Sequence, residues 1–198
     1  MLDKYKDLNL VSIDATRIYC CSAEDSEPAS ISLDSPALSV MTDLKQRPAV
    51  TISPTQSIDS ALELMNSARV RMLIVADDTG HVFGILKASE ILGGTPTRIA
   101  HDDAIPRADI QVSRLMLPVA NLHALTLDEV ASARIGDVVL TLSHLGEPDI
   151  LITQSSGDET QIRGILSVSE ISKELGLNFD VSSRAHTFAE LERAIINS

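Results

Sequence analysis

The apolar positions in the first half of the chain predict a strand, a helix, a two-stranded hairpin and a second helix. Residues 50–52 have the β-branched character of a short strand, which Ser53-Pro54 ends. Ser57 stands at the N-cap of a helix with apolar residues at i, i+3, i+4 and i+7: Ile58, Ala61, Leu62 and Met65. The run 72–76 predicts a buried strand. A turn at 77–80, whose glycine takes the positive φ, leads to the hairpin partner at 81–86. A helix follows near Lys87 and stops at Gly93-Gly94.

The second half of the chain repeats this order. Residues 84–91, GILKASEI, return as GILSVSEI at 164–171, with six of the eight positions identical. Strands are predicted at 124–127, 150–152 and 162–166, with a turn at 154–158. The helix between the first two strands repeats the apolar face: Ile135, Val138, Val139 and Leu142. The pattern matches Val50 with Leu125 in the first strand, Ile58 with Ile135 in the helix and Gly84 with Gly164 after the turn. The spacing between the copies therefore grows along the repeat, and the two insertions that this requires fall in loops. This indicates an internal duplication, in which each repeated glycine lets another backbone come close.

The segments outside the repeats divide the chain further. We interpret residues 1–36 as an N-terminal extension, with a short strand at 16–21, and residues 95–109, which are polar and carry two prolines, as a linker. The repeats then occupy 37–94 and 110–176. The tail 177–198 contains a predicted helix that begins at a capping box, Thr187-Phe188-Ala189-Glu190.

Composition and charge narrow the classes of function. The net charge of −12 argues against binding to nucleic acid or to an anionic membrane, and any phosphate must be held by local groups against this field. Neither a signal peptide nor a membrane span is evident, and the adjacent Cys20 and Cys21 read as reduced thiols, so we expect a cytoplasmic protein. The five histidines lack the spacing of metal ligands, and no nucleophile–base motif is present, so we expect neither a metal site nor an enzyme.

The duplicated strand-helix-strand-strand-helix unit resembles the cystathionine-β-synthase (CBS) domain pair. Met41 and Met116 each lie nine residues before a first strand, similar to the Met-Thr-Pro run that often begins a CBS unit. The two Gly-Ile-Leu stretches look like the third strand of that family. The resemblance implies an α+β fold of two βαββα units, packed sheet to sheet around a pseudo-twofold axis, with two clefts between them. It also implies a stand-alone regulatory protein, a homodimer, that acts on a partner protein yet to be found.

In many members of the family the clefts bind adenosine derivatives, so the resemblance implies AMP, ADP or ATP as ligand, with no required cofactor. The usual signature is Gly, two aliphatic residues, Ser or Thr, two residues, then Asp; the hydroxyl meets phosphate and the carboxylate accepts the ribose hydroxyls. Its positions correspond here to Ser167 and Glu170 in the second unit and to Lys87 and Glu90 in the first. The family pattern adds residues from the start of each unit's strands: Thr51, Val70, Arg71 and Pro148 with its neighbour Glu147.

Two alternatives remain open at these positions. Ser167-x-x-Glu170 is also an ordinary capping box, in which the hydroxyl serves the helix and not a ligand. Both carboxylates are Glu where the family has Asp, and Lys87 replaces the hydroxyl residue. These departures favour a second hypothesis: a scaffold or dimerisation module whose clefts hold no ligand.

Overall fold

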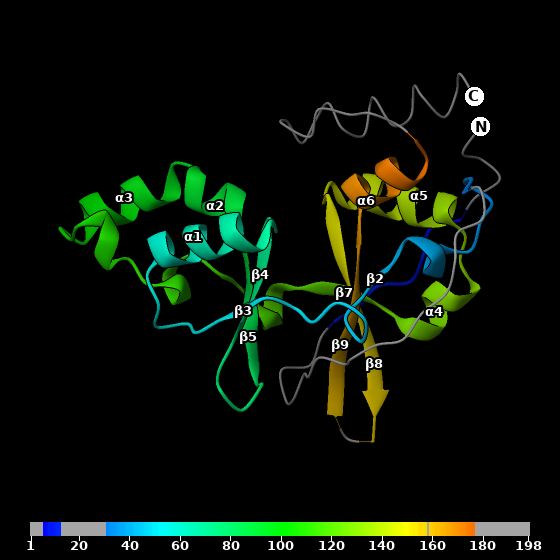
Figure 1. Cartoon of the computed structure of the whole chain (residues 1–198), viewed down its shortest axis with the longest axis horizontal. Coiled ribbons are helices and arrows are strands. Elements are labelled where there is room, and N and C mark those ends of the chain that lie inside the picture. Colours follow the sequence, from blue (N-terminus) through cyan, green and yellow to red (C-terminus); the bar gives the residue numbers. More distant parts are fainter. Residues whose placement is uncertain (1–5, 13–30, 158, 177–198) are drawn as a thin grey trace.

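In the computed structural model, which describes residues 6–12, 31–157 and 159–176, the two repeats form two sheets that face each other (Figure 1). The first sheet has the strand order β3-β4-β5-β6. The elements of the first unit are β3 (Thr51–Ile52), α1 (Ile58–Ala68), β4 (Met72–Ala76), β5 (Val82–Lys87) and α2 (Ala88–Leu92). β3 runs parallel to β4, and β5 runs antiparallel to it. The expected α+β fold and the βαββα order are therefore confirmed.

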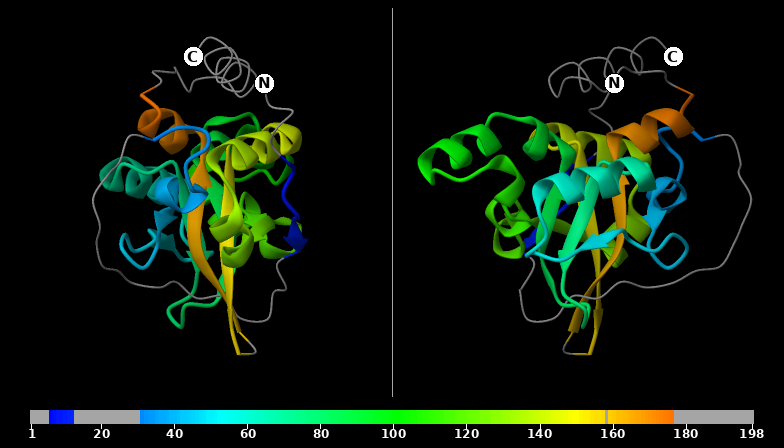
Figure 2. Two further views of the ribbon diagram at one scale, coloured as in Figure 1. Left: turned by 90° about the vertical axis from the view of Figure 1, so that its right-hand side faces the viewer. Right: turned by 60° about the vertical axis from the view of Figure 1, so that its left-hand side comes forward.

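The second unit repeats this arrangement with additions. Its elements are β7 (His123–Thr126), α4 (Leu127–Ser132), α5 (Ile135–Leu145), β8 (Asp149–Ser156), β9 (Glu159–Ser167) and α6 (Val168–Glu174). Two further strands flank its sheet, β1 (Val11–Ser12) and β2 (Thr42–Asp43), which gives the order β1-β7-β8-β9-β2. Figure 2 shows the principal helices of both units on one side of the molecule and the two hairpin turns on the opposite side.

The two units exchange short strands. β2 precedes β3, the first strand of the first unit's own sheet, but pairs with β9 of the second unit, with Asp43 opposite Gly164. β6 (Leu117–Pro118) precedes β7 in the same way but pairs with β5 of the first unit, with Pro118 opposite Gly84. A Cβ atom on Gly84 would overlap the carbonyl oxygen of Leu117. The repeated glycines thus admit a crossing strand, as the sequence predicted, and the exchange gives the pair its approximate twofold relation.

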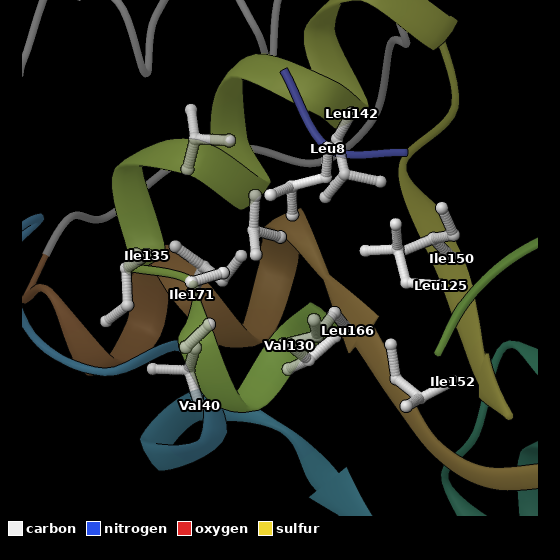
Figure 3. Close-up of a cluster of buried hydrophobic side chains, with 14 of the residues drawn as sticks. Leu8, Val40, Leu125, Val130, Ile135, Leu142, Ile150, Ile152, Leu166 and Ile171 are labelled. Atoms are coloured by element: carbon white, nitrogen blue, oxygen red, sulfur yellow. The ribbon is translucent and has the colours of Figure 1, made fainter. Parts of the chain in front are cut away.

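The strands are apolar on both faces because both faces are covered. In β4, Leu73 and Val75 pack in the same cluster as α1, whereas Ile74 and Ala76 pack towards the second sheet. β8 follows the same rule: Ile150 and Ile152 belong to the core beneath α5, drawn in Figure 3, and its other face joins the seam. The seam is itself a hydrophobic core with members from both units: Ile74, Ile85, Ala124, Leu151 and Ile162.

The connection between the units contains a helix that the sequence pattern did not predict. Residues 95–109 hold α3 (Thr95–Asp102) and the 3₁₀ turn Arg107–Asp109. Pro96 lies in the first helical turn, where a missing N–H breaks no hydrogen bond, so this proline marks a helix start and not a loop. The other 3₁₀ turns are Ala37–Val40, Val112–Arg114 and Val119–Asn121.

Two details of the predicted repeat were wrong. The turn expected at 154–158 is shorter, because β8 continues to Ser156 and β9 resumes at Glu159. In the first strands Leu125 corresponds to Ile52 and not to Val50, since Ile52 and Leu125 occupy equivalent places opposite Val75 and Ile152. The extra residues before α5 form α4, which the pattern missed. Ser57 at the N-cap of α1, Gly80 at positive φ and Gly93 at the end of α2 lie as predicted.

The described part of the N-terminal extension lies on the second unit. Leu8 joins the core of that unit, and β1 covers the free edge of β7. Asp137, buried on α5, accepts hydrogen bonds from the backbone N–H groups of Lys6 and Arg134. The predictions for residues 16–21, for both cysteines and for the tail helix at 187–197 lie outside the described residues.

Candidate functional site

A pocket opens at the seam between the units, beside the end of β5. Its empty space, including the part open to solvent, is about 500 Å³. Met72, Ile85 and Lys87 line it from the first unit. The second unit supplies an apolar wall that includes Leu122 and Leu145. The pocket therefore has the inter-unit position that the sequence implied for a cleft.

An ion-pair cluster, which we call the Lys87 end of the pocket, forms the charged part of its lining. The Nζ atom of Lys87 donates to Oε2 of Glu147 at 2.7 Å and lies 3.7 Å from Oδ2 of Asp149. The Lys87 side chain is only 13% exposed, against 44% for Glu147 and 27% for Asp149. Lys87 is the last residue of β5, while Glu147 follows Gly146, whose φ of +66° turns the chain from α5 towards β8. The contact thus joins the two units through charge.

The position that corresponds to Lys87 in the second unit is occupied by Ser167. Ser167 pairs with Asp149 across β8 and β9 as Lys87 pairs with Met72 across β4 and β5. Its Oγ atom accepts the backbone N–H of Glu170 at 3.2 Å, so it is the N-cap of α6. Lys87 occupies the N-cap of α2, but its side chain makes no capping hydrogen bond. The capping interpretation of Ser167 is therefore supported, and its hydroxyl is engaged in this structure.

The remaining predicted residues lie around the two corresponding ends of the sheets. Glu90 and Glu170 stand in the first turns of α2 and α6, and Glu170 pairs with Lys173 at 3.0 Å. The carbonyl groups of Arg71 and Pro148 accept the first N–H groups of α2 and α6, from Ala88 at 2.8 Å and Val168 at 2.9 Å. These backbone contacts are equivalent in the two units. The side chain of Arg71 is exposed, as is Thr51 on β3.

The described geometry joins Lys87 and the Glu147 neighbourhood in one pocket. Val70 precedes β4 by two residues, as Glu147 precedes β8, so Val70 is the uncharged counterpart of Glu147. Asp149 is a pocket residue that sequence reasoning missed. One signal in the sequence could have found it. Asp149 stands where the first unit has Met72, so a carboxylate begins an otherwise apolar strand and needs a hydrogen-bonding or charged partner.

The exchanged strand β2 carries a second charged contact of the seam. Both terminal nitrogens of Arg163 donate to the carboxylate of Asp43, with Nη2 at 2.8 Å from Oδ2. Burial acts to raise the pKa of Asp43, but the hydrogen bond and charge of Arg163 and the backbone N–H of Lys45 outweigh it. The pKa of this carboxyl is therefore lowered from its ordinary value.

Other kinds of site find little support in the described residues. Within 6–12, 31–157 and 159–176, no group of three or more His, Cys, Asp or Glu is placed to hold a metal ion. No helix in these same ranges is long and apolar enough to cross a membrane.

Comparison with known proteins identifies the fold. Residues 39–94 match the model of the CBS domain family. An uncharacterised protein from Pyrococcus horikoshii has a similar structure, with a TM-score of 0.54 and 22% identity, covering 77% of this chain and 100% of its own. The structure of CBSX2 in complex with AMP has a TM-score of 0.50 and 20% sequence identity, and the match covers 70% of this chain and 94% of CBSX2. CBSX2 comes from Arabidopsis thaliana. MJ1225 from Methanocaldococcus jannaschii, a proposed archaeal homologue of g-AMPK, has a TM-score of 0.54 and 20% sequence identity. The match covers 70% of this chain and 49% of MJ1225. No curated protein matches the sequence significantly.

These findings define the class first: the described structure has the fold of the CBS-domain pair. Residues 39–94 match the family's model, and the elements from β7 to α6 repeat the same βαββα order. The resemblance inferred from the sequence is thus confirmed.

Proposed function

We propose that this protein is a non-catalytic regulatory module that binds an adenine nucleotide, AMP, ADP or ATP, between its two CBS units. The observation that carries the proposal is the pocket at the seam, because both units line it and a bound ligand would touch both at once. A neighbouring fold, CBSX2, was crystallised with AMP, which adds support.

Regulation would work through the relative arrangement of the two units. A ligand that contacts both favours the arrangement in which those contacts form, and can shift the population only by its difference in affinity between arrangements. Lys87 and Glu147 already connect the units here, so a ligand at this end of the pocket would change a contact that holds the pair together. A partner protein, and a second copy of the chain in a homodimer, would then sense the altered surface. We place this activity in the cytoplasm.

A thermal-shift panel of adenosine, AMP, ADP, ATP and S-adenosylmethionine with the full chain tests this proposal. A ligand at ten times its Kd adds about 1.4 kcal/mol, which raises the Tm of a chain of this size by roughly 3–6 °C. Stabilisation by at least one compound is expected, and none at millimolar concentration by any of them would contradict the proposal. UTP serves as the control for non-specific phosphate effects.

A second candidate function is a ligand-free scaffold or dimerisation module. The specific observation that favours it is that the two signature positions are already occupied: Lys87 by Glu147, and the Ser167 hydroxyl by the helix it caps. Light scattering of the full chain across the same panel separates the two. A fixed dimer mass with no thermal response to any ligand would support the scaffold.

A further inference from the structure

The charges at the Lys87 end of the pocket are unbalanced. Among the described residues that line the pocket, Lys87 is the one lysine or arginine, and it faces two carboxylates, Glu147 and Asp149. His123 also lines the pocket, from the exposed start of β7. The ammonium group that would receive a phosphate therefore already has two carboxylates beside it.

The geometry prevents Lys87 from simply turning to an incoming phosphate. Its side chain is 13% exposed and its Nζ atom is bound to Glu147 at 2.7 Å. A phosphate group that took this position would have to separate that pair and lie beside both carboxylates, in a chain whose net charge is −12. A phosphate carries about −1.5 to −2 charges at neutral pH, and like charges within a few Å repel strongly in a partly buried site.

The rest of the pocket suits an uncharged ligand. Its walls are apolar side chains from both units, such as Met72, Ile85, Leu122 and Leu145. Carboxylate oxygens only accept hydrogen bonds, so Glu147 and Asp149 match ligand hydroxyl or amino groups and do not match phosphate oxygens. An apolar body that carries hydroxyl and amino donors is the chemistry of a nucleoside.

The carboxylate pair is not imposed by the fold. The residues of the first unit that correspond to Glu147 and Asp149 are Val70 and Met72, which are apolar. The two carboxylates are thus a difference between the two units.

We propose that Glu147 and Asp149 are specificity-determining residues that exclude phosphate from the Lys87 pocket, so that this pocket binds the uncharged nucleoside part of its ligand. This inference rests on the proposed function and deepens it. It ranks the ligands of this pocket by charge: adenosine binds more tightly than AMP, and AMP more tightly than ATP.

Calorimetric titration of adenosine, AMP and ATP into two full-length double variants tests this charge filter. The test variant is Glu147→Gln with Asp149→Asn, and the matched control is Glu63→Gln with Asp78→Asn. The control removes the same net charge from exposed positions outside the pocket. The test variant is expected to bind AMP about tenfold more tightly than the control variant does, and to exceed the control by a larger factor for ATP. For adenosine the affinities of the two variants should agree within about threefold. Comparison with the control cancels the overall field of the chain and any binding elsewhere.

An AMP affinity of the test variant equal to that of its control would overturn the charge filter, while the proposed adenine site would stand. If neither variant binds any of the three compounds, the proposed function and this inference are overturned together. If the double variant unfolds, Glu147→Gln alone, at a 44% exposed side chain, provides the same test. The single variant is then expected to gain about threefold for AMP over Glu63→Gln, and no gain would contradict the proposal.

Discussion

The two exchanged strands solve the same geometric problem with different chemistry. β6 pairs with β5 at Gly84, and β2 pairs with β9 at Gly164; we call these two pairings the crossings. The first contact is apolar, with Leu117 and Pro118 on the crossing strand. The second is fixed by the ion pair of Asp43 with Arg163, whose place in the first unit is taken by Phe83. The duplication has thus preserved the backbone arrangement, for which glycine is required, and has left the side chains free to diverge.

The glycines at the two crossings provide the largest expected difference. A Cβ on Gly84 would overlap the backbone oxygen of Leu117, which cannot move without breaking β6 from β5. A Cβ on Gly164 would lie 2.7 Å from Sδ of Met41, a flexible side chain, and 3.0 Å from the carbonyl oxygen of Thr42. We expect Gly84→Ala to cost at least about 3 kcal/mol of unfolding free energy, and Gly164→Ala about 1–2 kcal/mol. Urea denaturation of both variants measures the two costs, and equal costs would refute the difference between the crossings.

The ion pair at the second crossing comes next in size. Asp43 and Arg163 are 17% and 13% exposed, so neutralising the carboxylate leaves a mostly buried guanidinium without its partner. Asp43→Asn is expected to cost about 2–3 kcal/mol by urea denaturation. The control is Asp103→Asn, which removes an exposed pair with Arg114 and should change stability by less than about 0.5 kcal/mol. A loss at Asp43 as small as that at Asp103 would show that β2 is held by its backbone alone.

The same pair predicts how stability depends on pH. The pKa of Asp43 is lower in the folded protein than in the unfolded chain, so its contribution is complete above the ordinary value near 3.8. The contribution is lost as the pH falls from there through the folded value. The stability difference between wild type and Asp43→Asn should therefore stay constant from pH 7 to about 5 and shrink below about 4. A difference that grew on acidification would have the wrong sign for this account.

The two helix starts beside the clefts should show the smallest effects. Ser167→Ala removes the side-chain cap of α6 and is expected to cost about 1 kcal/mol, whereas Ser167→Thr keeps a hydroxyl and should cost less. Lys87→Met removes no cap, since Lys87 makes no side-chain cap hydrogen bond, and it leaves behind carboxylates that are 44% and 27% exposed and can be hydrated. Its cost should be about 0.5 kcal/mol. Thermal melts rank the three variants, and a larger loss for Lys87→Met than for Ser167→Ala would reverse this assignment.

Local sequence signals predicted those parts of the fold that depend on local physics. The apolar face of α1, the N-cap at Ser57 and the Gly80 turn were all readable because neighbouring residues determine them. The identity of the two glycine stretches indicated a close backbone approach before the crossing strand was known. The sequence does not predict helix α3, because a proline such as Pro96 and a polar composition are typical of loops as well as of helix starts.

The candidate site was less predictable because it depends on which side chains meet across the seam. The family pattern included Lys87, which lines the pocket, but gave no account of Asp149, which lies in the other unit and far away in sequence. The partner of a charge on one unit is set by the packing of the other, and no local pattern reports it. For Ser167 the sequence allows two roles, and the structure shows the hydrogen bond that belongs to one of them, the cap of α6.

The most direct test of the central claim, that the seam binds an adenine ligand, is an amide chemical-shift titration of the isotopically labelled full chain with adenosine and AMP. The account predicts shifts that cluster on both sides of the pocket, around Lys87 at the end of β5 and around Glu147 and Asp149 before and at the start of β8. The absence of shifts at millimolar ligand, or shifts confined to α3 and its neighbours outside the seam, would contradict it.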